Sequence, residues 1–361
     1  MSEASSTFDV HRLVRENIRR LTPYSSARSE FAGTAEVFLD ANENAFGSPA
    51  GNEYNRYPDP LQKELKGRIA ESNRVRPSQI FLGNGSDEAI DLLFRIFCEP
   101  GRDSALICPP TYGMYKVSAD INDVEVNEVR LTDDFHLDLP AIRKAITDRT
   151  KLIFICSPNN PTGNLMRREA VTEIARHFDG IVVVDEAYIH FADEPSLISD
   201  LNGSPNMVVL QTFSKAWGMA GLRVGLAFAC EDIIGLMNRV KPPYNVSGIA
   251  QRAVLDALDQ VDKVASWIRE VLIERDKIRR KLTAFDFIET IYPTQANFVL
   301  AKTNDADEIY RYLVDRQIIV RNRSNVDLCG GCLRITVGTP DENERLLEAL
   351  SCFVKERTVI S

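Results

Sequence analysis

The chain has 361 residues, which is longer than one hydrophobic core usually sustains, so we expect two domains. Hydrophobic residues make up 44% and charged residues 26%, and these values are typical of globular proteins rather than disordered ones. The formal net charge is -9, and a surface this acidic disfavours nucleic acid and anionic membranes as partners. The one basic cluster, at residues 279–281, is expected to be a solvated helix end.

The seven cysteines are odd in number, and several lie inside apolar runs. This pattern is typical of reduced, buried thiols and not of a disulfide framework. Cys329 and Cys332 could form half of a zinc site, but no second cysteine pair or nearby histidine accompanies them, so we expect no metal. Residues 1–7 are polar and no stretch approaches 18 apolar residues, so we expect a cytoplasmic protein without signal peptide or membrane span.

The first expected element is a helix at residues 10–20. Prolines interrupt the stretch that follows, and each removes a backbone donor, so we expect an extended arm there. We expect residues 1–45, the helix and the arm, to pack on the smaller of the two domains. The interrupting prolines are Pro23, Pro49, Pro58 and Pro60.

Residues 46–245 are expected to form the large domain, because short apolar runs there alternate with longer amphipathic stretches. Several runs are unbroken, and a strand that is apolar on both faces belongs in a sheet covered on both sides. The pattern predicts an α/β domain with a mostly parallel sheet, which binds ligands at the carboxyl ends of its strands. The expected strands are 80–82, 105–107, 152–155, 181–184, 207–210 and 224–228, and the expected helices are 86–97, 139–147 and 168–177.

After residue 245 the pattern changes, and residues 246–361 are expected to form a smaller α+β domain. Residues 249–285 form one long helical region that we expect to divide into two helices. The remaining expected elements are a strand at 296–301, a helix at 306–316, strands at 318–321 and 333–337, and a last helix at 340–355.

The first candidate site, Gly83-Asn84-Gly85-Ser86-Asp87-Glu88, lies between an expected strand and an expected helix. The glycines allow a tight turn, and the helix that starts at Ser86 and Asp87 presents free N–H groups that can bind a phosphate. The spacing matches neither a dinucleotide site nor a P-loop. A purely structural turn would look the same, so both interpretations stay open at this motif.

Two further motifs end strands. In residues 157–163 two prolines flank an asparagine pair, which predicts either a structural turn or an amide aimed into the crevice at the strand ends. Asp185 follows the strand at 181–184 and begins Asp185-Glu186-Ala187-Tyr188. A carboxylate at the end of a buried strand is costly unless it is paired, either with a cation or with backbone amides.

The fourth motif, Thr212-Phe213-Ser214-Lys215, follows the strand at 207–210, and Arg223 lies a short distance beyond it. Hydroxyl and guanidinium groups bind phosphate. A lysine in a partly desolvated site has a lowered pKa and forms Schiff bases with carbonyl compounds. Alone, such a lysine is more often a surface residue.

Together the four motifs supply the groups that pyridoxal 5'-phosphate requires, all at strand ends. We expect Lys215 to form the Schiff base, and Asp185 to pair with the pyridine nitrogen so that the ring can accept electrons. Asn160 and Tyr188 would hydrogen-bond the phenolic oxygen. The residues expected to hold the phosphate are Gly85, Ser86, Asp87, Thr212, Ser214 and Arg223.

From about residue 20 to residue 350 the sequence resembles the fold-type-I aminotransferases of class II, and among them the histidinol-phosphate aminotransferase family. The motifs that carry the general resemblance are those around Asn160, Asp185, Lys215 and Arg223. The motifs that carry the closer one are Leu21-Thr22-Pro23-Tyr24, Leu39-Asp40-Ala41-Asn42-Glu43-Asn44, Asn55-Arg56-Tyr57-Pro58, Pro110-Thr111-Tyr112, Ile319-Val320-Arg321 and Cys332-Leu333-Arg334-Ile335-Thr336-Val337-Gly338-Thr339.

The resemblance implies further roles. Tyr112 would stack on the cofactor ring and join Lys215 and Asp185 as a catalytic residue. Tyr57 would reach the cofactor phosphate of a partner subunit, which implies a homodimer with shared active sites. The resemblance implies substrate binding by Tyr24, Asn42, Arg321 and Arg334. Arg323 is a further candidate, because it would share a strand face with Arg321 if the strand at 318–321 continues through residue 323.

The implied reaction is transamination between L-histidinol phosphate and 2-oxoglutarate, which gives imidazole-acetol phosphate and L-glutamate in histidine biosynthesis. Aromatic-amino-acid aminotransferases and threonine-phosphate decarboxylases share most of the motifs and are alternatives. A non-enzymatic regulator with this fold would need an N-terminal DNA-binding module and a basic surface, which this acidic sequence disfavours.

Overall fold

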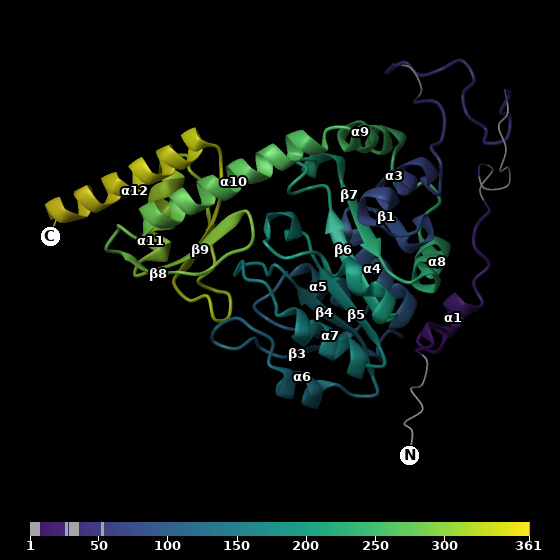
Figure 1. Ribbon diagram of the computed structural model, residues 1–361, viewed down its shortest axis with the longest axis horizontal. Coiled ribbons are helices and arrows are strands. Elements are labelled where there is room, and N and C mark those ends of the chain that lie inside the picture. The colour runs from purple at the N-terminus through teal and green to yellow at the C-terminus, as the bar shows by residue number, and fades with distance from the viewer. Residues whose placement is uncertain (1–7, 26–27, 29–35, 52–53, 361) are drawn as a thin grey trace.

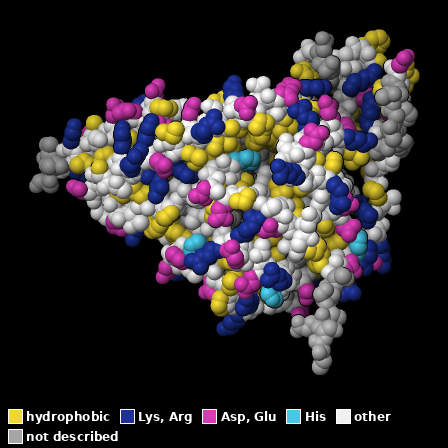
Figure 2. Space-filling model, in the orientation of Figure 1, with side chains coloured by type: hydrophobic (Ala, Val, Ile, Leu, Met, Phe, Trp, Pro, Cys, Tyr) yellow, Lys and Arg dark blue, Asp and Glu magenta, His cyan; other side chains and the backbone are white. Residues whose placement is uncertain are grey.

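The computed structural model describes residues 8–25, 28, 36–51 and 54–360. Figure 1 shows a larger α/β domain and a smaller domain at the C-terminal end, and the long helix α10 runs between them. On the face drawn in Figure 2, acidic and basic side chains are interspersed over both domains. The described residues of this face therefore present no continuous basic surface of the kind that binds nucleic acid. The described residues contain no helix long and apolar enough to cross a membrane.

The large domain is built on a seven-stranded sheet with the order β1-β7-β6-β5-β4-β2-β3. Strands β3, β2, β4, β5 and β6 run parallel to one another, and β7 runs antiparallel to both β6 and β1. All six predicted strands are confirmed. Strand β3 was not predicted, because it is a polar edge strand. The strands are β1 (Ile80–Asn84), β2 (Ser104–Ile107), β3 (Glu125–Glu128), β4 (Thr150–Cys156), β5 (Ile181–Asp185), β6 (Met207–Thr212) and β7 (Val224–Phe228).

Helices cover both faces of this sheet, as the unbroken apolar runs predict. Along β4, Ile153 and Ile155 pack into one core, whereas Leu152 and Phe154 pack into the other. Alternate side chains of β4 therefore pack into the hydrophobic cores on opposite faces of the sheet. The helices of this domain are α3 (Lys63–Asn73), α4 (Ser86–Phe97), α5 (Met114–Ile121), α6 (Leu139–Ala145), α7 (Arg168–His177), α8 (Glu231–Val240) and α9 (Gly248–Leu258), with short 3-10 turns η2 (Pro77–Gln79), η3 (Ile189–Phe191), η4 (Leu197–Gly203) and η5 (Ala220–Leu222).

The N-terminal segment differs from the expectation. The predicted helix at 10–20 divides into η1 (Val10–Arg12) and α1 (Glu16–Arg19), and it packs on the large domain, not on the small one. Its apolar residues Val10, Val14 and Ile18 join the core that contains α4 and α8. The Arg15 N–H donates to the carbonyl of Ile96 at the end of α4, at 3.0 Å.

The small domain contains a four-stranded antiparallel sheet with the order β10-β11-β9-β8. The predicted division of residues 249–285 into two helices is confirmed, but α9 packs its apolar face into the large-domain core. We therefore propose a domain boundary within α10 in place of the expected boundary after residue 245. The elements are α10 (Val261–Leu282), β8 (Ile288–Ile291), β9 (Phe298–Thr303), α11 (Ala306–Asp315), β10 (Arg321–Asn322), β11 (Cys332–Thr336) and α12 (Pro340–Ile360).

Strand β7 lies directly behind the turn between β1 and α4. Gly225 pairs with Gly83 across the two strands, and a Cβ atom on Gly225 would lie 2.1 Å from the backbone nitrogen of Ser86. Gly85, which makes the turn, has a φ of +80°, a conformation that favours glycine. The close approach of the two backbones therefore sets where α4 begins.

Replacement Gly225→Ala is expected to lower the free energy of unfolding by about 1–3 kcal/mol, because the methyl group forces the turn away from β7. Urea denaturation of the purified variant measures this loss. Gly235→Ala in α8 is the matched control, since a Cβ there meets no atom within 4 Å. It should raise the stability by about 0.5–1 kcal/mol. Equal stabilities of the two variants would contradict the packing argument.

Candidate active site

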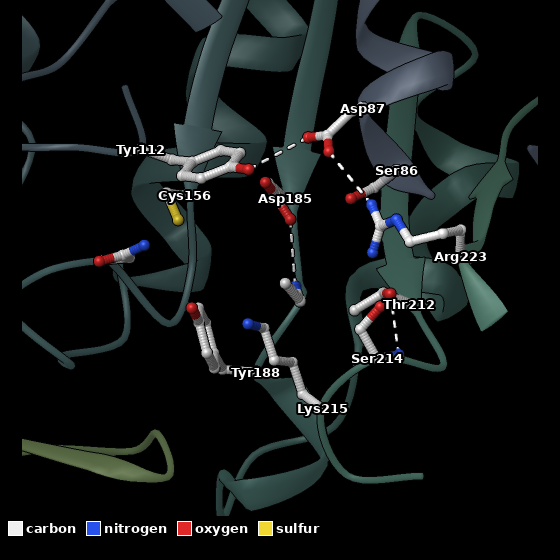
Figure 3. A pocket seen from close by; sticks show the side chains of 12 residues that line it. Ser86, Asp87, Tyr112, Cys156, Asp185, Tyr188, Thr212, Ser214, Lys215 and Arg223 are labelled. Atoms are coloured by element: carbon white, nitrogen blue, oxygen red, sulfur yellow. Dashed lines mark hydrogen bonds and ion pairs between the residues drawn. The ribbon is translucent and has the colours of Figure 1, made fainter. Parts of the chain in front are cut away.

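A pocket lies at the carboxyl-end edge of the large sheet (Figure 3). Strands β1, β4, β5 and β6 all end at this edge, and the antiparallel β7 begins there, which brings Arg223 to the same place. Most residues predicted from the four motifs are thus brought together. The pocket is lined by Ser86, Asp87, Tyr112, Cys156, Asn160, Asp185, Ala187, Tyr188, Thr212, Ser214, Lys215 and Arg223.

One end of the pocket is suited to an anion. Ser86 and Asp87 form the first turn of α4, whose N–H groups and dipole attract negative charge. Arg223 approaches this turn so closely that a Cβ on Gly85 would lie 2.5 Å from its Nη2 atom. Its guanidinium also pairs with the Asp87 carboxylate at 3.4 Å.

The hydroxyl groups of Thr212 and Ser214 border the same end of the pocket (Figure 3). The Thr212 Oγ1 atom accepts a hydrogen bond from the Ser214 N–H at 3.0 Å, which fixes the turn between β6 and Lys215. With Arg223 and the α4 N-terminus, these groups provide the donors that a phosphate monoester needs.

Asp185 ends β5 and is 3% exposed. Its Oδ2 atom accepts a hydrogen bond from the Tyr115 hydroxyl at 2.8 Å, and its Oδ1 atom accepts one from the Ala187 N–H at 3.1 Å. Burial raises the pKa of Asp185 to about 6, although both hydrogen bonds oppose this rise. A buried carboxylate at the edge of a pocket is suited to pair with a cationic ring nitrogen.

The Lys215 side chain points into the pocket toward Tyr188 (Figure 3). Its Nζ atom lies 5.4 Å from the centroid of the Tyr188 ring. Among the described residues it has no hydrogen-bond or ion-pair partner. Burial lowers the pKa of Lys215, and the positive charge of Arg334 lowers it further. A lysine in this environment is more often neutral than an exposed one, and can act as a nucleophile or base.

Two tyrosines lie on either side of the pocket. The Tyr112 hydroxyl donates to the Asp87 carboxylate at 3.1 Å, and the edge of the Tyr188 ring packs against Phe298 of the small domain. Burial raises the pKa of both hydroxyls, so both keep their protons and can donate hydrogen bonds. Tyr188 therefore belongs to the contact between the two domains as well as to the pocket.

The two neighbouring asparagines, Asn159 and Asn160, make different contacts. Asn159 is fully buried and donates to the carbonyl of Pro110 at 2.8 Å, so it stabilises the turn. Asn160 lines the pocket, and its side-chain oxygen accepts a hydrogen bond from Arg334 on β11. The structural and the functional interpretations of this motif thus apply to neighbouring residues.

An arginine group on the small domain faces the pocket residues. Arg334 lies opposite Arg321 in the register of β10 and β11, and its guanidinium lies over the Phe298 ring at 5.2 Å. The backbone N–H of Arg323 donates to the carbonyl of Cys332 at 2.8 Å. Burial and the charge of Arg323 lower the pKa of Arg334. No carboxylate among the described residues pairs with these three arginines, and the buried Nε atoms of Arg323 and Arg334 have no partner there.

Gly85, Arg321 and Arg334 do not themselves line the described pocket, and neither do three predicted residues from the N-terminal part of the chain, Tyr24, Asn42 and Tyr57. Tyr24 is 77% exposed, and the Tyr57 ring stacks on Tyr244 with a centroid distance of 4.4 Å. All three belong to the N-terminal segment and arm. Their predicted roles depend on a second subunit or on a different position of the arm.

The sequence did not identify Tyr115, although its hydroxyl contacts Asp185. It lies three residues after Tyr112, just inside the start of α5, and the two rings meet edge-on. That spacing was the available signal, but it is equally typical of core packing.

The described residues contain no cluster of three or more His, Cys, Asp or Glu side chains that could hold a metal ion. Cys329 and Cys332 are buried free thiols.

Comparison with known proteins agrees with this architecture. The family described as aminotransferase class I and II matches residues 28–350. A histidinol-phosphate aminotransferase from Cytophaga hutchinsonii is 52% identical over 346 residues, which cover 96% of this chain and 99% of the relative.

Solved structures with the same fold include two of interest for the site. One is a histidinol-phosphate aminotransferase from Sinorhizobium meliloti in complex with pyridoxal 5'-phosphate, with TM-score 0.74, 25% identity and coverage of 87% of this chain and 90% of that one. Another is an L-threonine-O-3-phosphate decarboxylase from Porphyromonas gingivalis, with TM-score 0.71, 25% identity and coverage of 83% and 91%. With a family match over most of its length and a relative that is 52% identical across 96% of the chain, the protein belongs to the aminotransferase class I and II family.

Proposed function

We propose that the protein is a pyridoxal-phosphate-dependent transaminase that converts L-histidinol phosphate and 2-oxoglutarate to imidazole-acetol phosphate and L-glutamate. Relatives that are 52% and 51% identical to this chain are named histidinol-phosphate aminotransferases, which supports histidinol phosphate as the amino donor. The observation that carries the proposal is the group formed by Arg321, Arg323 and Arg334 beside the Lys215 pocket, because these cations lack carboxylate partners among the described residues. A substrate with a phosphate at the far end from its amine would supply the missing anion.

The donor set of the pocket fits the cofactor. Its phosphate would bind at the N-terminus of α4, where Arg223, Thr212 and Ser214 add donors, and Gly85 leaves room for the guanidinium. The Asp185 carboxylate would hold the proton on the ring nitrogen. When bound, the cofactor supplies a carbonyl that takes up the amino group and a ring that accepts electrons.

The remaining pocket residues would orient the ring. Tyr112 lies on the α4 side of the pocket and would cover one ring face, whereas the Asn160 amide and the Tyr188 hydroxyl would donate to the phenolic oxygen. The raised pKa of Tyr188 keeps this hydroxyl protonated, so it can donate. Fixing the ring from several sides prepares it for reaction before the substrate arrives.

Lys215 would carry the proton that the reaction moves. Its lowered pKa increases the neutral fraction of the amine, which would then remove the proton from Cα of the substrate and deliver it to C4′ of the cofactor. Arg334 would hold the carboxylate of glutamate in one half of the cycle. In the other half, Arg334 and Arg321 would hold the phosphate, with Tyr24 and Asn42 assisting and Arg323 as a further donor.

The rival activities fit the observations less well. An aromatic-amino-acid aminotransferase has no need for additional arginines at the distal end. A threonine-phosphate decarboxylase would use a phosphate site, and its solved structure is as distant from this chain as the Sinorhizobium meliloti aminotransferase, each at 25% identity. The relatives at 52% and 51% identity are histidinol-phosphate aminotransferases by name and favour transamination. The regulator alternative finds no support in the relatives at 52% and 51% identity, which are aminotransferases by name.

We also propose a homodimer with shared active sites. The arm exposes large apolar side chains, and Phe46 and Leu39 are 101% and 86% exposed. Exposed apolar groups in this number are typical of a surface that another chain covers. Within the described residues of the arm, the Glu43 carboxylate accepts from Arg28, Arg56 and the Tyr57 N–H, which links these described segments to one another. The seven free cysteines agree with a reducing compartment, and we propose the cytoplasm.

A half-reaction tests the substrate. L-histidinol phosphate alone, added to enzyme loaded with pyridoxal phosphate, should convert the cofactor from its aldehyde to its amine form, as followed by absorbance. Phenylalanine and threonine phosphate should react at least about 10-fold more slowly, since neither matches both ends of the site. Lys215→Ala should abolish the conversion in every case. Faster conversion by either rival substrate would overturn the substrate assignment.

Arg321→Met should weaken the use of L-histidinol phosphate selectively. Loss of one charged hydrogen bond to the phosphate is expected to raise its KM by about 10-fold. The glutamate half-reaction should change much less, because Arg334 is retained for the carboxylate. Arg311→Met in α11 removes an exposed arginine outside the site and is the matched control. Equal losses with both substrates would mean that Arg321 does not discriminate between them.

Mixed dimers test the shared site. A Lys215→Ala chain and a Tyr57→Ala chain should each have low activity, but a hybrid dimer contains one site with both wild-type residues. Random exchange of subunits should therefore restore about a quarter of the wild-type activity. Size-exclusion chromatography establishes the dimer in parallel. If mixing restores no activity although the chains exchange, Tyr57 does not act across the interface.

A further inference from the structure

Tyr115 on α5 makes the closest described contact to Asp185 from outside the pocket. The side chain is fully buried, and its hydroxyl donates to the Asp185 Oδ2 atom at 2.8 Å. Its ring stacks on Phe154 with centroids 4.8 Å apart and meets the Tyr112 ring edge-on at 5.6 Å. Packing on both sides therefore fixes where this hydroxyl points.

The Asp185 carboxylate has two hydrogen bonds within the described chain. The Ala187 N–H binds Oδ1 and comes from the same chain segment, whereas the Tyr115 hydroxyl binds Oδ2 from a different element. An ionised carboxylate can accept about four hydrogen bonds, so acceptor positions remain for a group in the pocket. The hydrogen bond from Tyr115 therefore restricts rotation of the Asp185 carboxylate group.

The charge state of Asp185 depends on opposing effects. Burial raises its pKa most, and the Tyr115 hydrogen bond is the largest effect that lowers it, followed by the Ala187 N–H. The negative charge of Asp87 adds to the rise, and the positive charge of Lys215 reduces it. The Tyr115 hydroxyl keeps its proton, because burial and the Asp185 charge both raise its own pKa.

The other titratable groups around Asp185 are the hydroxyls of Tyr112 and Tyr188 and the thiol of Cys156. Burial raises the pKa of each of them, so each is neutral when Asp185 titrates. The Cys156 thiol borders the Tyr115 hydroxyl, and as a neutral group it is a weaker acceptor than the carboxylate. The Tyr115 hydroxyl therefore donates its hydrogen bond to the Asp185 carboxylate in preference to the Cys156 thiol.

We propose that Tyr115 is a positioning residue, whose hydroxyl holds Asp185 ionised and aimed at the ring nitrogen of the cofactor. The inference rests on the proposed role of Asp185, but the contact between the two side chains does not depend on that role. Without the hydroxyl, one oxygen of a buried carboxylate loses its partner. Asp185 then binds a proton more readily, and a protonated Asp185 cannot pair with a cationic ring.

Tyr115→Phe tests this directly, because phenylalanine keeps the ring contacts and removes only the hydroxyl. Infrared titration of the enzyme without cofactor should show that Asp185 takes up its proton at higher pH in the variant than in the wild type. The Asp185 band is identified by its loss in the same protein with Asp185→Asn. The affinity for pyridoxal phosphate should fall about 10-fold, in line with the loss of one charged hydrogen bond.

Tyr312→Phe is the matched control. It also removes a hydroxyl that donates to a carboxylate, that of Glu356 at 2.9 Å, but on the surface of the small domain. Neither the titration of Asp185 nor the cofactor affinity should change in this variant. Urea unfolding of the Tyr115→Phe enzyme without cofactor should show a cooperative transition with a modest loss of stability, because one buried hydrogen bond is removed while the ring packing is kept.

The outcomes separate the possible explanations. An unchanged Asp185 titration overturns the proposal, and so does a Tyr115→Phe enzyme that loses its fold, because the hydroxyl would then serve stability alone. If Asp185→Asn leaves the cofactor affinity unchanged, the proposed role of Asp185 fails. The infrared titration, which uses the enzyme without cofactor, still decides whether Tyr115 controls the charge of Asp185.

Discussion

The arrangement of the site depends on one constraint: a carboxylate, Asp185, is buried at the end of a central strand. Burial alone would neutralise it, and the surrounding fold supplies two hydrogen bonds that oppose this. Each donor is fixed by a different part of the structure, the turn after β5 and the packed face of α5. The pocket therefore presents an acceptor for a cation on a side chain that is almost fully buried, where electrostatic interactions are stronger than in water.

The sheet topology distributes the other groups around this point. Parallel strands deliver the residues that follow them to one edge, which unites the turns after β1, β4, β5 and β6. The antiparallel β7 enters from the same edge and brings Arg223 next to Gly85. An anion end, a buried carboxylate and a partly desolvated lysine thus lie in a fixed order along one pocket.

The two domains meet beside this pocket. Arg334 on β11 binds Asn160 of the large domain, and Tyr188 packs against Phe298 of β9. Residues proposed to hold the cofactor therefore contact residues proposed to hold the substrate. A shift of the small domain would change both sets together, which gives a physical basis for coupling substrate binding to the geometry around Lys215.

Local sequence determined the strands of the large sheet and the motifs at their ends, because unbroken apolar runs and turn residues act over a few positions. It also determined the cofactor chemistry, since Asn160, Asp185 and Lys215 each end or follow a recognisable strand and Arg223 immediately precedes one. Only the tertiary structure decided that Asn159 supports the turn while Asn160 faces the pocket, that Val10, Val14 and Ile18 pack on the large domain, and that Tyr115 contacts Asp185. These contacts join residues far apart in the chain, and an apolar or aromatic side chain has the same local pattern whichever surface it covers.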